Sequence, residues 1–100
     1  MTNALLDVLV KARARIDKPQ KWCAHWWASE DGRRLGADGA VWEFAGHGTD
    51  LTADAMRALA EHSGINGLWP AHERVTYLVF HKEVMAMFNG AIDELLDRRS

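Results

Sequence analysis

Apolar side chains recur at helical spacing at both ends of this chain, and no other feature constrains its fold as strongly. Near the N-terminus, one helical face is formed by Leu5, Val8, Leu9, Ala12 and Ile16. Near the C-terminus, a second stripe is formed by Val84, Phe88, Ala91, Ile92 and Leu95. Such a stripe must be buried against another element. We therefore predict a helix over residues 3–16, which Pro19 cannot continue because it lacks an N–H, and a helix from residue 84 onward.

Signals for helix ends predict two further helices in the middle of the chain. Asp38 is expected to cap a short helix that the glycines of segment 46–48 end. Thr52 is expected to cap the next helix, and Gly64 to close it in the left-handed conformation. Segment 75–80 is rich in β-branched and aromatic residues, and it either forms a strand or opens the last helix.

Segment 22–35 favours a short β-hairpin. Trp22 and Trp26 share a face in a strand, although they also share one in a helix. The pair Asp31–Gly32 is typical of a two-residue hairpin turn. The predicted fold is thus a mainly α domain of four helices, with this hairpin and an α+β class left open.

The overall composition narrows the class of protein. A chain of 100 residues is expected to form one domain over residues 1–100. Its net charge of -2 gives no general attraction to nucleic acid or to anionic membranes. No apolar run approaches the roughly 18 residues of a membrane span, and the charges at Asp7, Lys11 and Arg13 do not fit a signal peptide. We expect a cytoplasmic location, with no disulfide inside the chain because Cys23 is its single cysteine.

The tryptophans provide the strongest sequence signal for a contact surface. Burial in the core would account for Trp22, Trp26, Trp42 and Trp69 without any partner. Trp26 and Trp27 are adjacent, however, so they point to opposite faces of a strand or lie about 100° apart on a helix. At least one of the two is therefore expected to be exposed. We predict that Trp22, Trp26 and Trp27 contact a protein partner, since tryptophan is frequent at binding hot spots.

A basic face accompanies these tryptophans. Lys11, Arg15 and Lys18 share a narrow arc of the first helix, with Lys21 just beyond it. We include these four residues in the predicted partner-binding surface. Phosphate contacts and stacking on tryptophan would also suit single-stranded nucleic acid, but the negative net charge disfavours that alternative. A solvated helix face would explain the same residues with no ligand.

Catalytic and metal motifs are weak. The histidines show no spacing typical of metal sites: His25, His47, His62, His72 and His81. We expect no metal and no cofactor. Arg57 and His62, and likewise Arg74 and His81, match the Arg/His spacing of helical ribonucleases, but about one such match is expected by chance. A helical ribonuclease is therefore the alternative to a non-enzymatic module, and no catalytic residue is predicted.

The order of elements resembles that of a small bacterial and phage family of unknown function. In this family a helix, a tryptophan, an Asp-Gly turn and two helices precede a terminal helix that a His-x-Glu-Val run opens. The matching residues are Trp22, Asp31, Gly32, Ile65, Trp69, the run 81–84 and the stretch 88–92. The resemblance covers nearly the whole chain and implies architecture rather than chemistry. Because the family is frequent in mobile elements, the resemblance also implies a protein that binds and inhibits or modulates a host complex, of the anti-defence or anti-CRISPR type.

The sequence therefore predicts a small protein-interaction module that uses a tryptophan-rich surface. The expected occupant of this surface is a protein partner or a second copy of the chain. A nucleic-acid binder and a ribonuclease are the alternatives.

Overall fold

Five α-helices carry most of the chain that the structure describes. A computed structural model gives the backbone of residues 3–99 and the side chains of residues 3–98. The helices are α1 (Ala4–Arg15), α2 (Ala37–Ala45), α3 (Asp50–Ala60), α4 (Ala71–Thr76) and α5 (His81–Arg99), and a 3-10 turn, η1, covers Pro19–Lys21. The mainly α prediction is confirmed, with α4 in addition to the four helices that were predicted.

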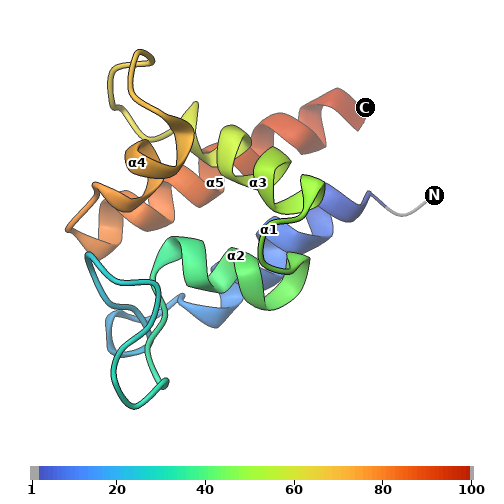
Figure 1. Cartoon of the computed structure of the whole chain (residues 1–100). Helices are drawn as coiled ribbons and strands as arrows, with labels where there is room; N and C mark the ends of the chain where they lie inside the picture. Colours follow the sequence, from blue (N-terminus) through green and yellow to red (C-terminus); the bar gives the residue numbers. More distant parts are fainter. Residues whose placement is uncertain (1–2, 100) are drawn as a thin grey trace.

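The core forms where α1, α2, α3 and α5 meet (Figure 1). Both predicted apolar stripes face it: Leu9 of α1, Ile16 directly after α1 and Phe88 of α5 are fully buried. The radius of gyration is 12.4 Å, close to the value of about 13 Å expected for a compact domain of this size. The described ends of the chain lie on one side of the molecule, while segment 22–35 and α4 lie on the other (Figure 1).

Two predicted helix caps are displaced. The N-cap of α3 is Thr49 rather than Thr52, and the Thr49 hydroxyl accepts a hydrogen bond from the Thr52 N–H at 3.0 Å. Thr52 is buried inside the first turn, where its own hydroxyl donates to the carbonyl of Gly46. Likewise α2 begins one residue after Gly36, so Asp38 lies within the helix and does not cap it. In both cases the extended backbone that a cap requires comes earlier in the chain.

The helix ends agree with the sequence only in part. Gly46 ends α2 with a φ of +89°, as predicted. Gly64 has a φ of +77°, but α3 already ends at Ala60. Segment 75–80 neither forms a strand nor opens the last helix. Val75 is buried on α4, the chain then runs irregularly to residue 80, and α5 begins at His81.

The hairpin expected over 22–35 does not form, and no strand occurs within residues 3–99. The Asp-Gly turn is present: Gly32 has a φ of +71°, and its N–H donates to the Ser29 carbonyl at 2.9 Å. The flanking segments make only isolated bridges, in which Leu35 pairs with both Trp22 and Ala28. A ladder is absent because the backbone at Trp27 turns toward α2 instead of continuing along Leu35.

Candidate functional site

Segment 22–35, here called the tryptophan loop, is braced on the start of α2. The N–H of Gly36 donates to the carbonyl of Trp27 at 2.9 Å. A Cβ atom added at Gly39 would lie 1.9 Å from that same carbonyl oxygen, and one added at Gly36 would lie 2.4 Å from the carbonyl oxygen of Trp26. Only glycine leaves room for so close an approach. Gly36 at the N-cap of α2 and Gly39 within α2 thus fix the backbone that presents Trp26 and Trp27.

Both side chains of the adjacent tryptophan pair project into solvent. Trp26 is 72% exposed and Trp27 is 58% exposed. His25 directly before them has a φ of +71°, a left-handed conformation that is uncommon outside glycine. Trp22 is half-buried, and its ring lies 5.6 Å from that of His81 at the start of α5. The prediction that at least one of the pair is exposed is confirmed.

Full burial in the core does not account for the tryptophans. Trp22 is half-buried against the core and Trp42 is also half-buried, whereas Trp69 is 42% exposed and Trp26 is more exposed still. The aliphatic residues of the helices, together with Phe88, already fill the interior. The large indole rings therefore lie outside it.

Trp27 forms one wall of a groove that we call the aromatic recess. The recess has a volume of about 620 Å³ and is lined by Trp27, Leu35, Gly39, Trp42, Glu43 and His47. The rings of Trp27 and Trp42 are 6.0 Å apart and inclined by 46°. The His47 ring meets Trp42 edge-on at 4.4 Å. The lining is mainly apolar, with the carboxylate of Glu43 as its acidic group.

A buried carboxylate supports the recess from behind. The Asp38 side chain is 7% exposed, and one of its oxygens accepts the N–H of Gly39 at 2.9 Å. The other oxygen lies 3.2 Å from Nε2 of His72 on α4. The His72 ring in turn lies parallel to Trp42 at 6.2 Å. This contact connects α4 to α2 and holds the indole of Trp42. Sequence reasoning missed it because neither residue belongs to a recognisable motif.

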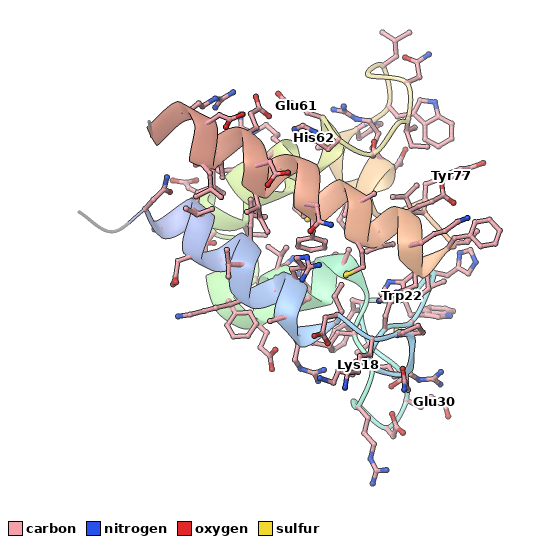
Figure 2. All side chains as sticks on the ribbon, turned by 180° about the vertical axis from the view of Figure 1, so that it is seen from behind. Lys18, Trp22, Glu30, Glu61, His62 and Tyr77 are labelled. Atoms are coloured by element: carbon pink, nitrogen blue, oxygen red, sulfur yellow. The ribbon has the colours of Figure 1, made fainter. Side chains whose placement is uncertain are left out.

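A second group of exposed apolar side chains lies at the same end of the molecule. Its members flank α4: Leu68, Trp69, Tyr77, Val79 and Phe80. Leu68 is 90% exposed, and the rings of Trp69 and Tyr77 meet edge-on at 5.3 Å. Figure 2 shows Tyr77 and Trp22 at this end, away from the described ends of the chain. No sequence pattern predicts this group, because its members are spread over two irregular connections.

Three of the four residues in the predicted basic face are paired with acidic residues. Each of the three has an acidic partner: Lys11 with Asp7 at 3.0 Å, Arg15 with Glu43 at 3.3 Å, and Lys21 with Asp17 at 3.5 Å. The fourth residue, Lys18, is exposed where the chain leaves α1. Phosphate binding requires free cationic groups, so these pairs weaken the case for a nucleic-acid interface. Arg15 pairs with Glu43, and Glu43 lines the aromatic recess.

The ribonuclease pairs face different partners. Arg57 pairs with Asp54, while Nε2 of His62 lies 2.7 Å from a carboxylate oxygen of Glu94. Nε2 of His81 donates to the carbonyl oxygen of Ile16, the residue that follows α1, at 2.7 Å. The Arg57 pair lies within α3, whereas the two histidine contacts join segments that are distant in the sequence. Within the described residues, no group of three His, Cys, Asp or Glu side chains is placed to hold a metal ion.

Cys23 lies partly buried in the tryptophan loop. Its Sγ is within 3.5 Å of the carbonyl oxygen of Trp26 and 3.6 Å of that of Arg34. Burial raises the pKa of the thiol above its ordinary value, and the nearby charge of Arg34 offsets part of that rise. A raised pKa disfavours the thiolate, which is the nucleophilic form of cysteine.

Comparison with protein-family models, curated proteins and solved structures found no match. The resemblance to a bacterial and phage family stays a prediction. Within residues 3–99, no helix combines the length and apolar character that crossing a bilayer requires.

Proposed function

We propose that this chain is a non-enzymatic interaction module that binds a protein partner through the tryptophan loop. One observation carries the proposal: Trp26 and Trp27 are 72% and 58% exposed on a backbone that α2 holds in place. Adjacent exposed indoles leave a large apolar surface in water, which a folded domain normally avoids unless a partner covers it.

The bracing of the loop favours tight binding. A side chain that is ordered before association loses less conformational entropy when the complex forms. Indole rings also provide large contact areas with few rotatable bonds, which makes them frequent hot spots. The exposed residues beside α4 lie at the same end of the molecule, and the ring contact of Trp69 with Tyr77 orders two of them.

The more specific version of the proposal is a cytoplasmic phage or mobile-element protein that binds and inhibits or modulates a host complex. This version rests on the family resemblance and on the aromatic surface together. The partner occupies the exposed tryptophans, and the paired charges of α1 lie at the margin of the contact.

The test is capture of a partner by the immobilised chain from a bacterial lysate, with the captured protein identified by mass spectrometry. Trp26→Ser combined with Trp27→Ser should abolish capture while leaving the circular dichroism spectrum unchanged. Leu96→Ser is the matched control, because Leu96 is 47% exposed on α5. Capture that survives the double substitution, or that Leu96→Ser removes equally, would contradict the proposal. Light scattering tests whether a second copy is the occupant.

A further inference from the structure

We infer that the aromatic recess receives an arginine side chain of the protein partner. The inference deepens the proposed function and rests on it, because the arginine is taken to belong to the protein partner. It assigns to the recess a ligand of defined chemistry, a planar guanidinium group.

The walls of the recess suit a cation. The indole rings of Trp27 and Trp42 both line the groove, with centroids 6.0 Å apart and planes inclined by 46°. The face of an indole carries negative electrostatic potential and attracts a cation placed over it. Leu35 is buried and Gly39 has no side chain, so the floor provides apolar contact for the methylene groups of an arginine.

Glu43 supplies the charge that a cationic occupant needs. Its carboxylate belongs to the lining of the recess, and its side chain is 44% exposed. A guanidinium can pair with a carboxylate through two parallel N–H groups while its plane stacks on an aromatic ring. The recess offers both kinds of partner within one groove, whereas a purely apolar side chain would leave the carboxylate unused.

The chain itself shows that a guanidinium fits at this carboxylate. Nε of Arg15 lies 3.3 Å from Oε2 of Glu43. The pair is partly exposed, and pairs of this kind contribute little stability, so a guanidinium from a partner can exchange with it. Nη2 of Arg15 also lies 3.5 Å from the carbonyl oxygen of Arg33, which gives the displaced side chain another acceptor. Arg15 is therefore an internal competitor for the site.

Titration with acetyl-arginine amide tests the inference directly. The indole N–H signals of Trp27 and Trp42 are followed by NMR, and acetyl-citrulline amide serves as the neutral analogue of nearly the same shape. We expect arginine to shift both signals and to bind about tenfold more tightly than citrulline. Equal binding of citrulline or of acetyl-leucine amide would show an apolar site and overturn the inference. Absence of shifts at both indoles would overturn it as well.

Two charge variants sharpen the test. Glu43→Gln should weaken arginine binding several-fold, whereas Arg15→Gln should strengthen it because the competing guanidinium is gone. Arg98→Gln is the control for net charge, since Arg98 pairs with Glu94 within α5 and does not line the recess. If Arg98→Gln strengthened arginine binding as much as Arg15→Gln does, the effect would reflect net charge alone and the inference would be overturned.

The arginine inference and the proposed function can fail independently of each other. Partner capture that needs Trp26 but is unaffected by Glu43→Gln would overturn the arginine inference alone. Arginine binding at the recess would support the inference even where the tryptophan loop fails to capture a protein, and the proposed function would then fail by itself.

Discussion

Replacing Gly39 by alanine tests the contact that presents the tryptophan pair. In a helix interior, alanine is favoured over glycine by about 1 kcal/mol, so an unhindered Gly39→Ala substitution would stabilise the domain. Here the new Cβ would lie 1.9 Å from the carbonyl oxygen of Trp27 and 2.9 Å from its carbonyl carbon. Both are backbone atoms, so the loop must move and cannot relieve the contact by rotating a side chain.

The expected free-energy change has two unfavourable parts. Overpacking of this kind costs about 1–3 kcal/mol. Movement of the loop also weakens the hydrogen bond from Gly36 to Trp27, which contributes about 0.5–1.5 kcal/mol. After the gain of about 1 kcal/mol in helix propensity is subtracted, we expect a net loss of about 2 kcal/mol in the free energy of unfolding. For a domain of this size that corresponds to a Tm lower by roughly 10 °C.

Denaturant titration and thermal unfolding measure this loss, and the emission maximum of tryptophan fluorescence reports displacement of the loop. Gly67→Ala is the control, because no atom lies within 4 Å of the added Cβ and Gly67 has no left-handed φ. The control should leave stability unchanged or raise it by up to about 1 kcal/mol. A Gly39→Ala variant as stable as the control would refute the bracing of the loop on α2.

Three other properties follow from the structure. A hydrogen bond from His62 lowers the pKa of the Glu94 carboxyl, so its contribution to stability is present above the unfolded-state pKa of Glu94 and is lost as pH falls through the lowered folded-state pKa. Urea titrations between pH 6 and pH 3, which bracket the ordinary glutamate pKa of about 4.3, should show that His62→Ala loses less stability on acidification than the unsubstituted protein. An identical loss of stability would count against the contact. Burial raises the pKa of the Cys23 thiol, so iodoacetamide should modify it more slowly in the folded protein than in denaturant at the same pH, and equal rates would disprove this. Trp26→Ala should change the free energy of unfolding by less than about 0.5 kcal/mol, against a loss of about 3–5 kcal/mol for Phe88→Ala, and chemical denaturation distinguishes the two.

Local sequence patterns were enough to predict those parts of the protein that depend on neighbouring residues. The stripes ending at Ile16 and beginning at Val84 gave α1 and most of α5, because helical periodicity is a local property. The turn at Gly32 followed from the preference of glycine for a positive φ. The adjacency of Trp26 and Trp27 was enough to predict that one of them would be exposed.

The tertiary structure decided which of several local solutions the chain adopts. Thr49 and Thr52 are both capable caps, yet Thr49 caps α3 while Thr52 is buried and donates to the carbonyl of Gly46. The tryptophan loop had the turn of a hairpin, yet contact with Gly36 and Gly39 redirected its backbone. The aromatic recess joins side chains from the loop, from α2 and from the turn after it, and a fourth ring from α4 packs behind it. No local pattern encodes such an assembly, because packing brings together residues that are distant in the sequence.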